Sequence, residues 1–310
     1  MMAISVTDPI GRAFDWMKVV LFQPFDIGKW FILGFCSFLA YLGEGGFRFS
    51  FNQRMGGRGG VNFGQMLRDV TQWVEAHVAV IVVLMMVGLT LVVVFGALFA
   101  WLSSRGKFMF LDGVVRNRGA VTEPWRRFRE AGNRLFVFRL VVMLIGMAVG
   151  LLVAVVCLSV AWPEMGAGQP GWMVLTAVLI AVGTMLPFGL GMWILKALLA
   201  DFVVPIMYCR DVTAAEGLGV LWREMLRGHV GSFILFYLLK IVLGLAAAVV
   251  IVLGMCVTCC VAALPYLSSV VFLPVSVFFR SYSLYFLEQF GPEWRLLGGP
   301  APLMAEVVSE

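Results

Sequence analysis

Short basic amphipathic stretches alternate with long apolar ones along this chain, and the pattern occurs three times. Each copy begins with a Val-Thr pair, at Val6, Val121 and Val212. Behind each pair apolar residues recur at helical intervals, as Met17 and Leu21 do in the first copy, and charged residues occupy the opposite face. Helices of this kind lie in the headgroup plane of a membrane. The pattern predicts three interfacial helices, each leading into apolar spans.

The first residues of the three copies suit helix starts. Thr7, Thr122 and Thr213 stand where an N-cap hydroxyl would accept a hydrogen bond from an amide of the first turn. Thr213 and Glu216 also have the spacing of a capping box. We therefore expect each interfacial helix to begin at its threonine.

The apolar runs are long enough for membrane spans, since a hydrocarbon core of about 30 Å needs roughly 20 residues of helix. Six runs qualify or nearly do: 28–42, 78–102, 135–162, 172–200, 230–260 and 265–287. The first is short, and either extends back through Phe22 to Phe25 or enters the bilayer only in part. The fourth continues beyond a single span, with Pro187 and Pro205 as kink points.

These elements predict an all-α polytopic membrane protein with about six transmembrane helices. The helices form three repeats, each an interfacial amphipathic helix plus two spans. The repeat units cover about 6–102, 121–200 and 212–287 within a single membrane domain, 1–290, and a flexible cytoplasmic tail covers 291–310.

Composition and charge agree with this architecture. The chain is 61% hydrophobic and only 13% charged, whereas soluble domains carry about 25% charged residues. Segment 103–134 holds eight basic residues and 163–171 holds none. Because positive charge is retained inside, both termini are expected in the cytoplasm of a bacterium, with the protein in its inner membrane. One loop, 43–77, carries four arginines yet falls outside in this orientation.

A group of ionisable residues falls within or beside the predicted spans, all in the cytoplasmic half: Arg139, Lys196, Asp201, Lys240 and Arg280. A charge at bilayer depth costs about 2.5–3.5 kcal/mol, so each needs a partner, water or a route to the interface. Four cations and one carboxylate predict a pocket for an anionic ligand or lipid headgroup. The alternative is that their long side chains snorkel to the interface, which Arg139 and Lys196 can do easily and the deeper Lys240 less easily.

A second group of basic residues lies on the predicted interfacial helices and is expected to contact anionic lipid: Arg126, Arg127, Arg129, Arg223 and Arg227. No catalytic constellation, metal site or cofactor motif is predicted, and His77 and His229 are the only histidines in the chain. The basic residues separate apolar runs and do not form a nucleic-acid patch. We therefore expect no nucleic acid among the partners.

The stretches EPWRRFREAGNRLFVFRL from Glu123 and ADFVVPIMY from Ala200, in this helical context, resemble a group of bacterial integral membrane proteins. These are similar to the membrane domain that precedes the catalytic domain of some glycerophosphodiester phosphodiesterases. The resemblance covers most of the chain and implies a six-span membrane domain. It implies no catalytic residues, because in those enzymes the chemistry belongs to a separate soluble barrel.

Three functions are compatible with the sequence. The first is a transport-like or lipid-handling role near Lys240, Asp201 and Arg280. The alternative is a non-catalytic scaffold or accessory subunit, bound to anionic membrane lipids and to a protein partner or further copies of the chain. An intramembrane enzyme ranks last, because no nucleophile and base are found together.

Overall fold

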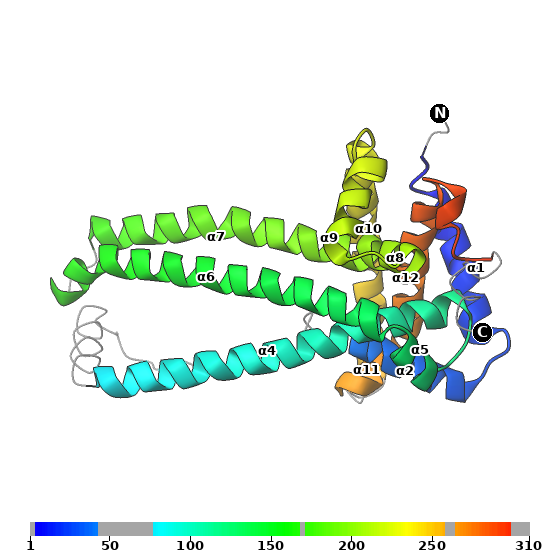
Figure 1. Cartoon of the computed structure of the whole chain (residues 1–310), viewed down its shortest axis with the longest axis horizontal. Helices are drawn as coiled ribbons and strands as arrows, with labels where there is room; N and C mark the ends of the chain where they lie inside the picture. Colours follow the sequence, from blue (N-terminus) through cyan, green and yellow to red (C-terminus); the bar gives the residue numbers. More distant parts are fainter. Residues whose placement is uncertain (1–3, 43–76, 168–170, 258–263, 299–310) are drawn as a thin grey trace. The chain divides into compact units, whose positions relative to one another are not determined.

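The computed structural model describes residues 4–42, 77–167, 171–257 and 264–298, and every regular element in these ranges is helical (Figure 1). This confirms the all-α prediction. The elements in chain order are α1 (Asp8–Phe22), α2 (Ile27–Tyr41), α4 (Val78–Val115), α5 (Thr122–Arg127), α6 (Arg129–Ala167), α7 (Trp172–Leu198), the π-helix η1 (Leu199–Val203), α8 (Val204–Arg210), α9 (Ala214–Val220), the π-helix η2 (Leu221–Leu226), α10 (Val230–Val257), α11 (Pro265–Val271), α12 (Leu273–Glu288) and the 3₁₀ turn η4 (Pro292–Trp294).

The chain divides into two compact units. Unit 1 consists of Met1–Phe47, Phe99–Phe138 and Ala197–Glu310, and unit 2 of Arg48–Leu98 and Arg139–Lys196. Unit 1 holds the short helices, α10 and the C-terminal part of α4, whereas unit 2 holds most of α6 and α7. The expected membrane domain, 1–290, is therefore built from two units, and unit 1 contains most of the polar groups discussed below.

Four helical segments are long and apolar enough to cross a membrane: Val78–Val115, Arg129–Glu164, Trp172–Arg210 and Val230–Cys256. Large apolar side chains are exposed along them, and Leu84, Leu152 and Leu245 are 63%, 66% and 71% exposed. Apolar surface exposed to water is unfavourable by about 25 cal/mol per Å², whereas hydrocarbon solvates it. The protein is therefore a helical membrane protein.

The first and sixth predicted spans are shorter elements. The first is α2, an apolar helix of 15 residues, Ile27–Tyr41. The sixth consists of α11 and α12, which are separated at Phe272. Pro274 lies in the first turn of α12, where its missing N–H leaves no helical bond unmade. The count of six spans and the threefold repeat remain predictions.

The segment 103–134, predicted to connect the second and third spans, begins inside helix α4. Helix α4 continues to Val115, and every residue from Ser103 onward in it is buried, including Arg105 and Lys107. The apolar run Phe108–Leu111 explains the difference, because its four side chains are at most 1% exposed and hold the helix inside unit 1. The two cations are therefore core residues and not part of a solvated loop.

Only one of the three threonines caps its helix through its side chain. The Thr213 hydroxyl accepts a hydrogen bond from the Glu216 amide at 3.3 Å, and the Glu216 carboxylate accepts one from the Thr213 amide at 2.8 Å. The bond from this amide holds the pKa of Glu216 below its ordinary value. Thr7 occupies the N-cap of α1 without a capping bond, and Thr122 lies inside α5, whose N-cap is Val121. The predicted capping box is thus confirmed. Thr7 takes the predicted N-cap position without the predicted side-chain bond, and the predicted N-cap position of Thr122 is wrong.

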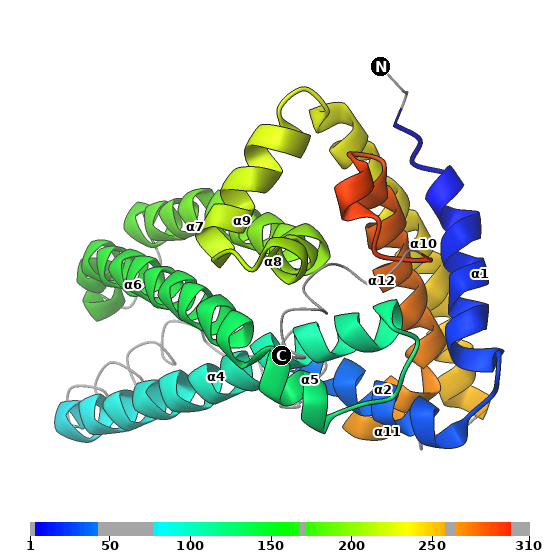
Figure 2. The same cartoon turned by 45° about the vertical axis from the view of Figure 1, so that its right-hand side comes forward.

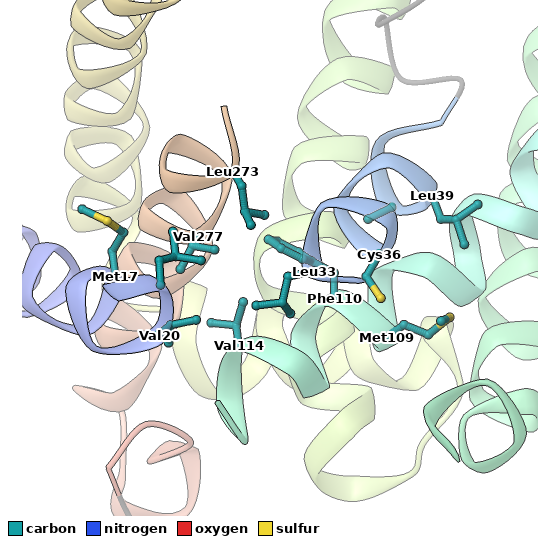
Figure 3. Close-up of a cluster of buried hydrophobic side chains, with 12 residues drawn as sticks. Met17, Val20, Leu33, Cys36, Leu39, Met109, Phe110, Val114, Leu273 and Val277 are labelled. Carbon is teal, nitrogen blue, oxygen red and sulfur yellow. The ribbon is translucent and has the colours of Figure 1, made fainter. Parts of the chain in front are cut away.

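The apolar core of unit 1 lies where α1, α2, α4 and α12 meet (Figure 3). Val20, Leu33, Phe110 and Val277, one from each helix, are at most 1% exposed within it. Helix α1 lies along α12, and α11 lies against α2 (Figures 1 and 2). The predicted interfacial helix α1 therefore packs on protein through its buried face, which includes Met17 and Leu21, whereas Phe14 of the same helix is 48% exposed.

Close packing of α4 on α2 depends on Gly106. A Cβ atom there would lie 2.5 Å from the Leu39 carbonyl carbon and 2.6 Å from the Ala40 nitrogen. Because these are backbone atoms, we expect Gly106→Ala to lower the free energy of unfolding by about 1–3 kcal/mol. Thermal unfolding in detergent measures the change. The control is Gly244→Ala in α10, where no atom lies within 4 Å; equal effects at the two sites would contradict the proposed contact.

Candidate functional site

Three buried helix ends gather polar residues inside unit 1. They are the C-terminal part of α4, the η1–α8 segment and the C-terminal part of α12. Asp112, Ser281 and Ser283 are 0% exposed, and Arg280 is 6% exposed. Buried polar groups are costly unless they are paired. The partners of these groups therefore define the polar centre of the unit.

Asp201 is the acceptor at one end of this centre. Its two carboxylate oxygens accept hydrogen bonds from the Lys240 ammonium at 2.5 and 2.6 Å. The Ser283 hydroxyl donates to the same carboxylate at 3.2 Å. The Asp201 side chain is 13% exposed and that of Lys240 is 24% exposed. The pair is mutually neutral, so Lys240 does not offer a free positive charge.

The π-helix η1 explains how Arg280 joins the cluster. In η1 the Val204 amide donates to Leu199, five residues earlier. The next donor in this register, for the Ala200 carbonyl, would be residue 205, which is a proline without an N–H. The Arg280 guanidinium donates to that carbonyl instead, at 2.7 Å. Pro205 therefore opens a backbone acceptor that Arg280 occupies.

The structure brings together three of the five predicted intramembrane residues. Asp201 lies in η1 of unit 1. Lys240 donates to its carboxylate, and Arg280 donates to the carbonyl of the preceding residue, Ala200. Arg139 and Lys196 belong to unit 2, where Arg139 is half-buried and Lys196 is exposed. The pocket of four cations thus remains a prediction, and the described geometry is that of a paired cluster. Ser283 was not predicted, although its i,i+3 spacing from Arg280 places the two on neighbouring positions of α12.

A second buried carboxylate was not singled out by the sequence. Asp112 forms ion pairs with Arg116 at 3.0 Å and Arg118 at 3.1 Å, and accepts a hydrogen bond from the Tyr208 hydroxyl at 3.0 Å. Arg118 also donates to Glu123 at 2.7 Å, which raises the pKa of Arg118 and lowers that of Glu123. Only the i,i+4 spacing of Asp112 and Arg116 was readable beforehand. This cluster ties α4 to α8 and to the segment that leads into α5.

The arginines on the surface of unit 1 differ in whether a carboxylate neutralises them. Several are paired with carboxylates: Arg12 with Glu288, Arg118 with Glu123, Arg134 with Asp211 and Arg210 with Glu224, at 2.7–3.2 Å. Within the described ranges, four exposed arginines have no ion pair: Arg126, Arg129, Arg223 and Arg227. All four are predicted lipid contacts. The fifth, Arg127, is half-buried with its guanidinium 5.5 Å from the Phe128 ring centre.

Among the described residues, no three His, Cys, Asp or Glu side chains lie close enough to hold a metal ion. The sequence-based expectation of no metal and no cofactor stays a prediction.

Comparison with known proteins gives a family but no function. The model of a family of unknown function (DUF7544) matches residues 4–272. No curated protein and no solved structure matches the chain.

Proposed function

The chain belongs to this family of unknown function, and we propose that it is a non-catalytic membrane protein that handles anionic lipid at its cytoplasmic surface. The observation that carries the proposal is the set of exposed arginines without carboxylate partners, Arg126, Arg129, Arg223 and Arg227. Each basic side chain near an anionic leaflet contributes about 1 kcal/mol of attraction. Arginines already paired with carboxylates contribute less, because their charge is neutralised locally.

The proposed architecture has six spans in three repeats, with both termini in the cytoplasm of a bacterial cell. The order of elements supports it, since α1, α5 and α9 each precede an apolar helix, α2, α6 and α10, and then a second helical stretch. The second helix of each set, α4, α7–α8 and α11–α12, ends in a buried stretch. This arrangement also supports the resemblance to the membrane domain of glycerophosphodiester phosphodiesterases. The partners proposed besides lipid are further copies of the chain or a second protein.

The proposal is tested by the lipid that accompanies the protein. The wild type, reconstituted in mixed phosphatidylglycerol and phosphatidylcholine and then purified in detergent, should retain phosphatidylglycerol in excess of the bulk ratio. Arg223→Gln/Arg227→Gln should lower that enrichment several-fold, at about 1 kcal/mol for each arginine. Mass spectrometry of the extracted lipid measures the ratio.

The matched control removes two charges that are already paired. Lys18 contacts Asp15 at 3.2 Å and Arg295 contacts Glu288 at 3.4 Å; the Lys18 and Arg295 side chains are exposed, and Glu288 keeps its pair with Arg12. Because exposed ion pairs contribute at most about 1 kcal/mol to stability, Lys18→Gln/Arg295→Gln should fold normally and keep the enrichment. The proposal fails if the wild type retains the two lipids in their bulk ratio, or if the two double variants lose phosphatidylglycerol equally.

A transport-like role is the second candidate, and the Asp201–Lys240 pair favours it. In many membrane proteins, ionisable residues within spans line the pathway of an ion or a proton. Single π-helical turns are frequent at functional sites. Asp201 combines both features, since it lies inside η1 and pairs with Lys240 of the span α10. In this role the pair would open to admit an anionic ligand to Lys240.

A further inference from the structure

An open pocket of about 430 Å³ in unit 1 is lined by two tryptophans and three arginines. Trp101 and Arg105 come from α4, Trp125 and Arg126 from α5, and Arg129 begins α6. Its volume falls within the range of about 300–1,000 Å³ that ligand sites occupy. Of the lining residues, only Arg126 and Arg129 were predicted to bind a ligand, as lipid contacts.

The lining of the pocket includes a buried arginine, Arg105, whose guanidinium lies against two indole rings. The Arg105 guanidinium lies 4.4 Å from the Trp101 ring centre and 4.8 Å from that of Trp125. The two rings are 5.8 Å apart and almost perpendicular, at 89°. Arg105 is only 8% exposed, so cation–π attraction replaces much of the water that its charge has lost.

One N–H group of Arg105 has a hydrogen-bond partner and another, also buried, has none. Its Nη2 donates to the Asn133 side chain at 3.1 Å. Its Nε is buried and has no hydrogen-bond partner among the described residues. Gly132 makes room for this side chain, because a Cβ there would lie 2.9 Å from the Arg105 Cγ. A buried donor without an acceptor costs about 1–3 kcal/mol or more when it is charged, so the pocket favours a ligand that supplies one.

The lining carries no carboxylate to neutralise its three guanidinium groups. The two acidic residues nearby in sequence are engaged elsewhere. Glu123 accepts from Arg118 at 2.7 Å, and Glu130 pairs with Arg134 at 3.8 Å. Arg126 and Arg129 form no ion pair within the described part of the chain. Like charges held together at a partly desolvated site favour binding of an anion between them.

We propose that this pocket binds a phosphate group, with its oxygens accepting hydrogen bonds from Arg105, Arg126 and Arg129. Planar guanidinium groups match phosphate oxygens in bidentate geometry. Two sources share this chemistry, a phospholipid headgroup and a free phosphate. The tryptophans suit the first, because indole rings gather at the headgroup level of membranes, and the exposed Phe99 precedes Trp101 by two residues on α4. The inference rests on the proposed anionic-lipid role and names the group that is recognised.

The test is a titration of lipid into the detergent-purified full chain, with the heat of binding measured by isothermal titration calorimetry. Dihexanoyl phosphatidylglycerol should bind saturably at one site per chain. Arg126→Gln/Arg129→Gln, whose parent side chains are exposed, should weaken that binding at least about tenfold, the equivalent of one lost charged hydrogen bond. Lys18→Gln/Arg295→Gln removes the same charge away from the pocket and should bind as the wild type does.

Inorganic phosphate separates the two sources. If it displaces the lipid at millimolar concentration, the site takes the free anion; if the lipid binds and phosphate does not displace it, the site takes the headgroup. Either result supports a phosphate site. The inference is overturned if neither ligand binds saturably, or if Arg126→Gln/Arg129→Gln and the control bind alike. That failure differs from failure of the proposed function, which is measured by lipid enrichment in Arg223→Gln/Arg227→Gln, outside the pocket.

Discussion

Replacing Lys240 by methionine is expected to lower the free energy of unfolding by about 3 kcal/mol, because it leaves Asp201 as an unpaired charge in a largely buried site. Lys240 supplies both short contacts to that carboxylate, at 2.5 and 2.6 Å, and Ser283 supplies one longer neutral contact. The hydroxyl cannot compensate for the lost positive charge. Unfolding in detergent, followed by circular dichroism, measures the effect.

A double variant separates the cost of an unpaired charge from the value of the pair. In Lys240→Met/Asp201→Asn neither member of the pair is charged, and most of the lost stability should return. Lys196→Met is the matched control, because it makes the same change at an exposed position of α7 and should change stability by less than about 0.5 kcal/mol. A double variant no more stable than Lys240→Met would contradict this account of the cluster.

The same double variant distinguishes the two candidate roles of the pair. If the refolded double variant keeps its phosphatidylglycerol enrichment, the pair stabilises the fold and anionic lipid binds elsewhere. If the fold is restored and the enrichment is lost, Lys240 contacts the ligand itself, as the transport-like role requires.

The grouping of Asp201, Lys240 and Arg280 shows which features of the site could be predicted. Their common depth followed from counting residues along apolar runs, and burial requires charges to find partners. The hydrogen-bond partners of these charges depend on backbone register and tertiary packing, which the length of an apolar run does not indicate. Arg280 bonds to the Ala200 carbonyl only because η1 changes register ahead of Pro205. That register is a tertiary outcome, so the bond was not predictable from hydropathy.

The long spans were predicted well because apolar runs of 20 or more residues dominate any local signal. The end of α4 was predicted poorly because charged residues there lower the local hydropathy. Arg105 and Lys107 look like loop residues in a hydropathy count, yet both are buried. Arg105 is held by Trp101 and Trp125, of which Trp125 lies twenty residues further along the chain. Its burial depends on that long-range contact, and the pocket that Arg105 lines was therefore missed.

The Asp112 cluster should give the largest single effect on stability. Asp112 is 0% exposed and neutralises Arg116 and Arg118 while accepting a hydrogen bond from Tyr208. Asp112→Leu keeps the branched shape but leaves Arg116 without its carboxylate, Arg118 with Glu123 alone, and the Tyr208 hydroxyl without its acceptor. We expect a loss of about 4 kcal/mol in the free energy of unfolding.

Asp112→Asn refines the prediction, because an amide oxygen still accepts from Tyr208 while the charge is lost. It should therefore cost less than Asp112→Leu and more than Asp15→Asn, which removes an exposed pair with Lys18 worth at most about 1 kcal/mol. Equilibrium unfolding of the three variants in the same detergent orders them. Should Asp112→Leu prove as stable as Asp15→Asn, the carboxylate would not be what joins α4 to α8. Shape complementarity of the apolar run Phe108–Leu111 would then hold this part of unit 1 together.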